Sequence, residues 1–445
     1  MLIRFKVGNF LSFNKIQELS MISGETRSHL DHIHKFDDMG VLKISALYGA
    51  NASGKSNLIK ALRESRQMIV MDMPLRANKY FRPSAANKDK PSYFEFEFEN
   101  NGKYYSYGFE FLLSKQKIES EWLYGLESEG DNKIFFQRIG NKIEHTFEGD
   151  DKIRMDVYAK DMKEFDRTLF LREMYRKTRT DEKGLLVFSD VFKWFSQKMK
   201  LFGADIYDNM DRIEKEKERD VVELLKAFDT GITGIHYERI EMPIDVVPAF
   251  YMNKIYEDLI REKKKNPNAE IMISSFKRGE VFSLSGENEV VLNKLVFKHK
   301  NSEASFDMEE ESEGTQRLYD LLKMIVSKDE DNIYILDELD IKLHPQLTFG
   351  FINLFLNQKV GTKNQLIFTT HESNLMDFKL LRRDEIWFVQ KEEDGSSSLY
   401  SLEDFNERTD RKIDKTYLEG RYGGVPVFST IFPISAGDTN EAPKK

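Results

Sequence analysis

A glycine-rich stretch near the amino terminus has the residue types that bind phosphate. It reads Gly49-Ala50-Asn51-Ala52-Ser53-Gly54-Lys55-Ser56, with Asn57 next. Glycines let the backbone approach a ligand closely, so its N–H groups and the start of the following helix can hold phosphate oxygens. We expect Lys55 to reach the β- and γ-phosphates of a nucleotide, and the Ser56 hydroxyl to coordinate Mg²⁺. The stretch therefore predicts a P-loop for ATP, with candidate ligands at Gly49, Asn51, Gly54, Lys55, Ser56 and Asn57.

A short acidic motif far downstream can supply the rest of this chemistry. Four apolar residues, 333–336, are followed by Asp337 and Glu338. A buried strand that ends at Asp337 would deliver its carboxylate to the Mg²⁺ shell. Glu338 could then polarise the attacking water. Taken alone, such a strand end is often a solvated turn, but together with the P-loop it predicts a site for ATP hydrolysis.

Two further segments stand on either side of the acidic strand. Ser312-Glu313-Gly314-Thr315 lies just before a predicted helix, and the apolar strand 365–370 leads into His371. Without their context, Ser312 would be a helix N-cap and His371 an ordinary histidine at a strand end.

With these four elements in this order, the sequence resembles the ABC-type ATPases, including the SMC-like repair ATPases and RecF. The resemblance implies that Ser312 and Gly314 complete the ATP site of a second protomer, through a shortened signature motif without the usual preceding Leu. It also implies that His371 senses the γ-phosphate. A homodimer or higher homo-oligomer with ATP at its interface is therefore expected.

Two segments narrow the resemblance. The segment 339–345 follows the acidic strand, ends in Leu343-His344-Pro345 and looks like the D-loop of RecF-like and OLD-like ATPases. Residues 417–426 are similar to the RloA/AbiL-type ATPases of bacterial defence loci. This likeness implies an anti-phage, abortive-infection switch that controls a separately encoded effector. A Toprim-like nuclease is one such effector, since the residues after His371 are too few to hold a nuclease domain of that kind.

The elements that must position these residues predict an α/β fold. A strand at 44–48 should enter the P-loop and a helix at 57–73 should leave it, while alternating aromatic residues around an Asn-Asn-Gly turn predict a β-hairpin at 92–113. Long charged stretches with helical spacing fill the middle of the chain. We expect an ABC-type P-loop head with three parts: an amino-terminal lobe with hairpins (1–150), a mainly helical insertion (151–275) and a carboxy-terminal lobe (276–445).

Composition excludes several other kinds of site. The 445 residues contain no cysteine, which rules out disulfides, thiolate metal sites and cysteine nucleophiles. No run approaches the length of a membrane helix, and the charged amino terminus does not fit a signal peptide, so we expect a cytoplasmic protein. His29, His32 and His34 have spacings compatible with a metal site, but their polar context favours a solvated loop.

Three other functions compete with a defence switch. The first is a RecF/SMC-like ATPase that binds DNA in repair or recombination, although the net charge of −9 argues mildly against a dedicated nucleic-acid binder. The second is the nucleotide-binding subunit of a transporter, which the shortened signature motif disfavours. The third is a small-molecule kinase, which would need no such motif.

Overall fold

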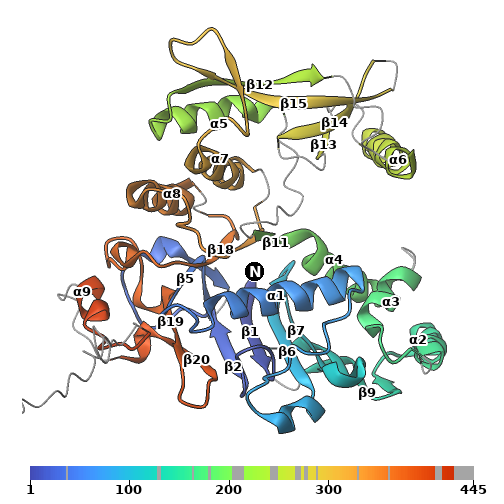
Figure 1. Cartoon of the computed structure of the whole chain (residues 1–445). Helices are drawn as coiled ribbons and strands as arrows, with labels where there is room; N and C mark the ends of the chain where they lie inside the picture. The colour runs from blue at the N-terminus through green and yellow to red at the C-terminus, as the bar shows by residue number, and fades with distance from the viewer. Residues whose placement is uncertain are drawn as a thin grey trace, which may run out of the picture.

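A six-stranded sheet crosses the middle of the computed structural model (Figure 1). In spatial order its strands are β11 (Met199–Phe202), β17 (Ile333–Leu336), β18 (Gln365–Thr369), β5 (Ile44–Tyr48), β19 (Ile386–Lys391) and β20 (Ser397–Ser401). All neighbours in this sheet are parallel except β19 and β20. The carboxyl ends of β17, β18 and β5 therefore meet at one edge, and the segments that follow these strands come together there.

The structure describes residues 1–36, 39–127, 132–162, 165–178, 182–202, 215–240, 249–265, 272–274, 279–286, 289–327, 330–358, 361–405 and 413–424. Val425 and Pro426, at the end of the predicted carboxy-terminal motif, lie outside these residues. Within the described part, no helix combines the length and apolar character needed to cross a membrane.

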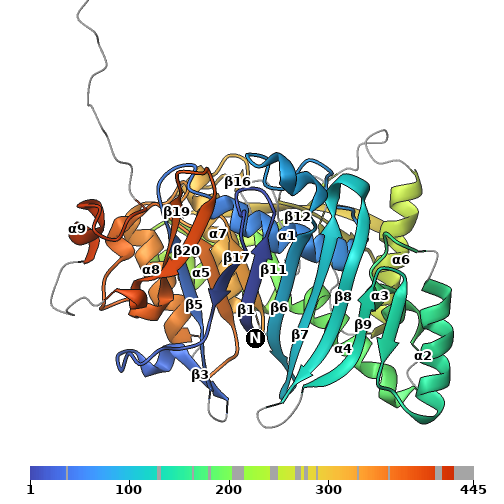
Figure 2. The same ribbon diagram turned by 90° about the horizontal axis from the view of Figure 1, so that it is seen from below.

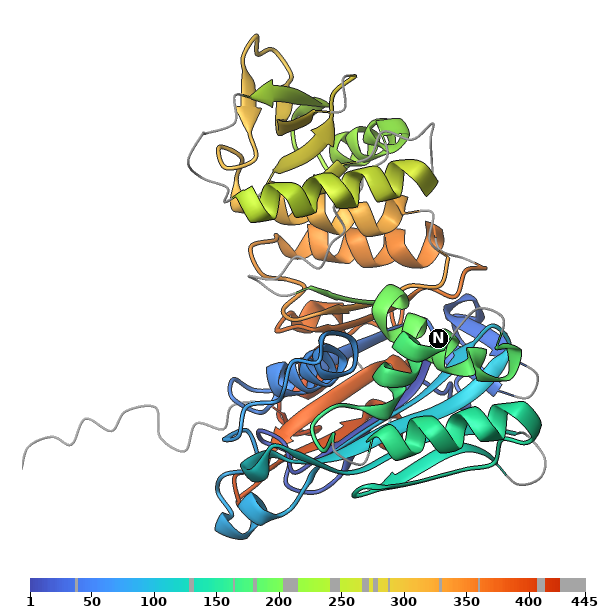
Figure 3. The same ribbon diagram turned by 90° about the vertical axis from the view of Figure 1, so that its right-hand side faces the viewer.

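The two faces of the central sheet pack into different cores because successive strand side chains point to opposite faces. Ile333 and Ile335 join the core with helix α1 (Lys55–Met71), whereas Tyr334 and Leu336 join the core with α7 (Glu313–Val326) and α8 (Pro345–Gln358). Figure 3 shows α1 and the α7–α8 pair on opposite sides of the sheet. All four side chains are fully buried, and burial of each aliphatic one contributes about 1.5–3 kcal/mol to folding.

A seven-stranded antiparallel sheet covers the other side of α1, and Figure 2 shows most of its strands side by side. Its order is β10 (Lys142–His145), β9 (Lys133–Ile139), β8 (Lys117–Leu126), β7 (Lys103–Leu112), β6 (Ser92–Asn100), β1 (Leu2–Gly8) and β2 (Gln17–Ser20). Phe94, Phe96 and Phe98 are fully buried in the core with α1. Asn101 and Gly102 have φ values of 54° and 76°, as a tight hairpin turn requires. The predicted hairpin lobe is confirmed.

The described residues of the block 151–275 are mostly helical, and the elements that they form are shared between several layers. Helices α2 (Gly149–Asp161), α3 (Phe170–Lys177) and α4 (Leu186–Lys193) pack on the core of the hairpin sheet, and β11 forms an edge of the central sheet. Helices α5 (Lys215–Ala227) and α6 (Ala249–Lys265) belong to the upper part of Figure 1. The charged composition gave no sign of β11 because the strand is only four residues long and Lys200 interrupts its apolar residues.

A third sheet lies beyond α7 and α8 in Figure 1. Its order is β12 (Ile232–Ile240), β15 (Val290–His299), β14 (Glu280–Leu284) and β13 (Met272–Ser274), with β16 (Ser305–Asp307) also paired to β15. The remaining regular elements are β3 (Ile33–Phe36), β4 (Met39–Leu42), α9 (Ile413–Leu418) and single helical turns at Leu30–His32, Ala85–Asp89, Leu113–Lys115, Lys183–Leu185, Trp194–Lys198, Ser373–Leu375, Arg383–Glu385 and Leu402–Asp404. The predicted α/β class with a hairpin lobe and helical segments is confirmed.

Candidate functional site

The glycine-rich loop connects β5 to α1, as the sequence predicts. Gly49 has φ 153° and Gly54 has φ 120°, values that side-chain-bearing residues rarely adopt. Gly54 is the N-cap of α1 and offers no capping side chain, so the first N–H groups of this seventeen-residue helix remain available to an anion. Asn51 is exposed at the tip of the loop. The backbone therefore forms a cradle suited to phosphate.

We predict that Gly49→Ala destabilises this cradle. The added methyl group would lie 2.3 Å from the carbonyl oxygen of Val389, a backbone atom on the neighbouring strand β19. Strain of this kind costs about 1–3 kcal/mol, and the loop must shift to relieve it. Urea unfolding should show the loss of stability, and nucleotide titration should show weaker ATP binding.

Gly102→Ala is the matched control for this substitution. Gly102 also has a positive φ, of 76°, but no atom lies within 4 Å of the position its Cβ would take. This variant should lose stability only through backbone strain, about 1–2 kcal/mol, and should bind ATP normally. Equal ATP affinities for the two alanine variants would show that the clash at Gly49 does not shape the loop.

Lys55 is buried at the mouth of the loop. Its Nζ donates hydrogen bonds to the carbonyl oxygens of Gly49 at 2.6 Å and Ala50 at 3.2 Å. Burial lowers the pKa of the Lys55 ammonium, and the nearby carboxylates of Asp337 and Glu338 oppose this shift. The ammonium thus lies inside the cradle among neutral carbonyls, which phosphate oxygens can replace.

Ser56 and Asp337 come from distant parts of the chain and meet beside the loop. The Ser56 hydroxyl donates to Asp337 Oδ1 at 3.1 Å. Thr369, at the end of β18, donates to the same oxygen at 2.7 Å. A hydroxyl and a carboxylate are ligands that Mg²⁺ prefers, so the residues present fit this ion. Thr369 was not among the predicted site residues. The parallel register of β17 and β18, which pairs Leu336 with Phe368, places the next residues of the two strands side by side.

Glu338 occupies an unusual backbone conformation directly after Asp337. Its φ of 53° lies in the left-handed region, which is uncommon for a residue other than glycine. Two contacts hold it there: its N–H donates to Thr369 Oγ1 at 2.7 Å, and its carbonyl accepts a bond from Arg317 Nη2 at 3.2 Å. Arg317 extends from the first half of α7, so the helix that follows Ser312 is fastened to the acidic strand end.

His371 lies at the same sheet edge, two residues after β18. Its side chain is exposed, and its backbone N–H donates to Asp340 Oδ2 at 3.3 Å. The other oxygen of that carboxylate, Oδ1, is buried and has no hydrogen-bond partner among the described residues. Asp340 therefore connects the segment after β17 to the segment that carries His371, and sequence reasoning gave it no such part.

Ser312 and Gly314 lie at the start of α7. The Ser312 hydroxyl caps this helix by accepting the Thr315 N–H at 3.1 Å. A Cβ on Gly314 would come within 2.8 Å of the Lys342 carbonyl oxygen, and Lys342 forms an ion pair of 2.6 Å with Glu313. Among the described residues, no hydrogen bond joins Ser312 or Gly314 to the P-loop of the same chain. The motif is on the surface, where a second protomer can reach it.

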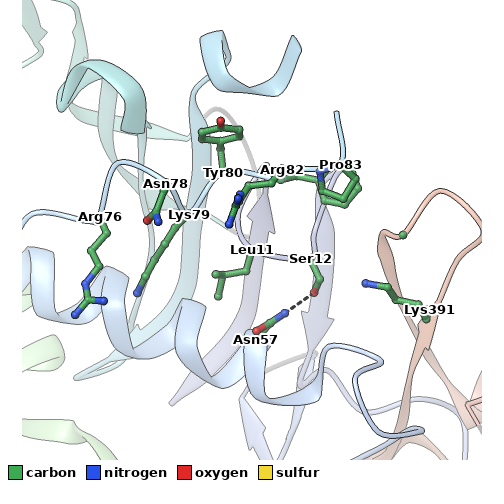
Figure 4. A pocket seen from close by; sticks show the side chains of 12 residues that line it. Leu11, Ser12, Asn57, Arg76, Asn78, Lys79, Tyr80, Arg82, Pro83 and Lys391 are labelled. Carbon is green, nitrogen blue, oxygen red and sulfur yellow. Dashed lines mark hydrogen bonds between the residues drawn. The ribbon is translucent and has the colours of Figure 1, made fainter. Parts of the chain in front are cut away.

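Asn57 links the P-loop helix to the turn between β1 and β2. Its Nδ2 donates to Ser12 Oγ at 2.9 Å, the bond drawn as a dashed line in Figure 4. Both residues line a cavity of about 450 Å³, together with the four cationic residues Arg76, Lys79, Arg82 and Lys391. A pocket of this size can accept a small ligand, and its charge favours an anion. Asn57 thus has a direct partner other than phosphate, and Ser12 is a residue of this region that we did not predict.

The carboxy-terminal motif packs against the start of the P-loop. The Tyr417 hydroxyl donates to the Gly424 carbonyl at 3.0 Å, and the rings of Tyr417 and Tyr422 both stack on Phe388 of β19. A Cβ on Gly424 would lie 3.4 Å from the Cα of Gly49. Residues 417–424 therefore pack directly against the first glycine of the P-loop.

A known protein family matches the part of the chain that contains this site. A family model described as "AAA domain, putative AbiEii toxin, Type IV TA system" matches residues 44–377. The chain belongs to this AAA-domain family. The match to the AAA-domain family begins at the first residue of β5 and ends shortly after His371, so it includes the P-loop, the Ser312 motif and the acidic strand end. Membership supports the predicted ATP-binding P-loop class, whereas the RloA/AbiL resemblance stays a prediction.

Several solved SMC head structures are similar to this AAA-domain chain at low identity. The SMC head domain from Thermotoga maritima is 14% identical, covers 90% of this chain and 98% of its own, and gives a TM-score of 0.34. An Smc head bound to the C-winged helix domain of ScpA is 13% identical, covers 90% of this chain and 97% of its own, and gives a TM-score of 0.36. A third structure is the Pyrococcus furiosus Smc head with an extended coiled coil, bound to the C-terminal domain of ScpA. It is 13% identical, covers 95% of this chain and 98% of its own, and gives a TM-score of 0.33. No curated protein matches the chain.

Proposed function

We propose that this protein is a cytoplasmic, Mg²⁺-dependent ATPase that acts as a molecular switch. The observation that carries the proposal is the contact of 3.1 Å between the hydroxyl of Ser56 and the carboxylate of Asp337. These side chains share no local structure, and their convergence beside a buried lysine is the arrangement that holds a metal–triphosphate. When held by Ser56 and Asp337, Mg²⁺ would supply positive charge that offsets the charge developing during cleavage of the triphosphate.

Each of this chain's own residues has a task that its position allows. Lys55 would exchange its bonds to the loop carbonyls for bonds to the β- and γ-phosphates. Glu338 would orient the attacking water and accept its proton, since its backbone is fixed by Thr369 and Arg317. His371 would contact the γ-phosphate at the end of β18. Its N–H bond to Asp340 connects that contact to the segment after β17.

We further propose that two protomers enclose two ATP molecules, and that closure and opening of this assembly control a separately encoded effector of the nuclease class. Support comes from the surface position of Ser312 and Gly314. The family description, which includes a putative toxin of a type IV toxin–antitoxin system, supports a place in anti-phage defence. A RecF/SMC-like function on DNA is the second candidate, favoured by the four cationic side chains around the cavity beside Asn57.

Asp337→Asn tests the proposed function. The asparagine oxygen can still accept the bonds from Ser56 and Thr369, so the fold should survive, but the negative charge for Mg²⁺ is lost. We expect phosphate release to fall at least about 100-fold, the scale for losing one group that stabilises the transition state. Cells that carry the gene with its neighbours should also lose their protection in a phage challenge.

Asp331→Asn is the matched control. Asp331 lies six residues before Asp337, in the turn that leads into β17, and pairs with Lys198 far from the P-loop. This variant should keep both ATP turnover and phage protection. Retained turnover in Asp337→Asn would contradict the metal-site assignment. If Asp337→Asn loses turnover but keeps full phage protection, the ATPase assignment stands and the defence assignment fails. Stimulation of wild-type turnover by DNA would favour the second candidate.

A further inference from the structure

A cluster of histidines lies at the opposite end of the central sheet from the P-loop. His29 and His32 belong to the turn at Leu30–His32, between β2 and β3, and the Lys43 N–H, just before β5, bonds to the His32 carbonyl at 2.9 Å. The expectation of a solvated loop is wrong for His32, which is only 4% exposed. Burial of a polar imidazole is unfavourable unless its nitrogens have partners, so those of His32 need them.

The ring of His32 is fixed by a buried carboxylate. Its Nδ1 lies 3.0 Å and 3.2 Å from the two oxygens of Glu385, which is fully buried directly before β19. One of those oxygens also accepts the Arg382 N–H at 2.7 Å. An ionised Glu385 can only accept, which places the proton of His32 on Nδ1. In the neutral imidazole, the other nitrogen, Nε2, then keeps its lone pair.

The ring of His29 is fixed in a comparable way. Its Nε2 lies 2.8 Å from the carbonyl oxygen of Phe378, and because a carbonyl can only accept, Nε2 must carry the proton. The lone pair of His29 is then on Nδ1. His29 also holds a left-handed backbone conformation, with φ 47° and ψ 55°, and its ring stacks on His32 with centroids 4.8 Å apart. Strained conformations of this kind gather at functional sites.

Asp31 adds a carboxylate to the two nitrogens. Its Oδ2 is 4.0 Å from His32 Nε2, and one ligand atom from each of His29, Asp31 and His32 lies within 4.8 Å of the others. The Asp31 side chain is 51% exposed, which gives an ion a path from solvent. The Lys43 ammonium bonds to the backbone carbonyl of Asp31 at 2.8 Å and fixes that part of the turn.

We propose that His29, Asp31 and His32 form a binding site for a zinc-like divalent transition metal. Two imidazoles and a carboxylate are the ligands that Zn²⁺ takes in proteins with three protein donors and one open position. Each histidine has the outer partner typical of a ligand, a carboxylate for His32 and a backbone carbonyl for His29. Each partner occupies one ring nitrogen and leaves the other, Nε2 of His32 and Nδ1 of His29, without that bond. This nitrogen-rich set differs from the all-oxygen ligands at Ser56 and Asp337.

The metal would stiffen the turn after β2, whose two histidines already bond to Phe378 and Glu385 in the connection between β18 and β19. That connection begins at His371, on the ATP side of the sheet, and reaches Phe378 and Glu385 on the histidine side. The two segments already share a bond of 2.8 Å between the Gly24 N–H and Asp384 Oδ2. The chain can therefore fold without the ion, and the ion would stiffen the far end of the segment that carries the proposed γ-phosphate sensor.

The experiment is a Zn²⁺ and Co²⁺ titration of the full-length protein without nucleotide, in the presence of excess Mg²⁺. We expect one tightly bound Zn²⁺ per chain by equilibrium dialysis, a rise in the unfolding temperature on binding, and a Co²⁺ absorption spectrum typical of a low-coordinate site with nitrogen ligands. Mg²⁺ should not compete, since it prefers oxygen ligands. Absence of stoichiometric Zn²⁺ binding by the wild-type chain would overturn the proposal.

Two conservative variants locate the site. Asp31→Asn and His29→Gln should each lower Zn²⁺ affinity at least about 10-fold and change the Co²⁺ spectrum. His34→Ala is the matched control, because His34 lies in the same segment but outside the cluster, and it should bind Zn²⁺ like the wild type. Circular dichroism of the metal-free variants verifies their folding. Unchanged affinity in Asp31→Asn and His29→Gln, or an equal loss in His34→Ala, would place the metal elsewhere and refute the assignment.

Discussion

Replacing Glu338 by glutamine is expected to reduce ATP turnover by about 10²–10⁴-fold, the usual contribution of a general base, while ATP still binds. Glutamine has the shape of glutamate but cannot accept the proton of the attacking water. The backbone contacts with Thr369 and Arg317 do not involve the side chain and should persist. Single-turnover phosphate release measures the chemical step, and a fluorescent ATP analogue measures binding.

The same variant should accumulate the ATP-bound oligomer. If hydrolysis is what opens the assembly, a chain that binds ATP without cleaving it remains closed, and light scattering should show a larger species only when Mg²⁺ and ATP are present. Glu330→Gln is the matched control, because Glu330 is an exposed residue shortly before β17. It should hydrolyse ATP at the wild-type rate. Undiminished turnover in Glu338→Gln would refute the assignment of the base.

The sequence was informative wherever a residue's task depends on its immediate neighbours. Glycines at 49 and 54 predict a tight loop because few other residues adopt their φ values. Alternating phenylalanines predict the β6–β7 hairpin because one face of that sheet must be buried. Four apolar residues before Asp337 predict a strand end that presents a carboxylate. Each of these inferences needs only local spacing and the physics of one element.

Contacts made through the tertiary fold were not predictable in this way. Thr369 is one polar residue at the end of an apolar strand, and its importance depends on β17 and β18 being neighbours in parallel register. Asp340 and Ser12 likewise acquire partners only when separate segments meet. The burial of His32 depends on Glu385, which is 353 residues away in the chain. No spacing rule connects such pairs.

The short strand β11 illustrates a different limit. Its four residues, Met199–Phe202, lie within a block whose charge and helical spacing dominate any window long enough to be interpreted. Only the open edge of β17 makes this segment a strand, because its backbone groups pair there in parallel. The layer that each segment of the middle block joins therefore depends on the assembled sheet and not on the local sequence.

Mixing two inactive variants should restore part of the ATPase activity if the site forms between chains. Lys55→Ala removes the phosphate contact, and Ser312→Arg should block the neighbour's nucleotide from the exposed start of α7. Each variant alone should be inactive. In an equal mixture, half of the dimers carry both variants, and one of the two sites in each is built from unmodified halves. About a quarter of the wild-type activity should therefore return if a twofold dimer is the active form.

Ser312→Ala separates this effect from the loss of the helix cap. Ser312 accepts the Thr315 N–H at 3.1 Å, and removal of such a cap typically costs about 1 kcal/mol of stability. If the alanine variant keeps most of its activity while the arginine variant loses it, the cap is not the cause, since both lose the same hydroxyl. Recovery in the mixture then requires that a P-loop from one chain work with the Ser312 surface of another. Absence of recovery, with dimers present by light scattering, would confine the site to one chain and contradict the proposed switch.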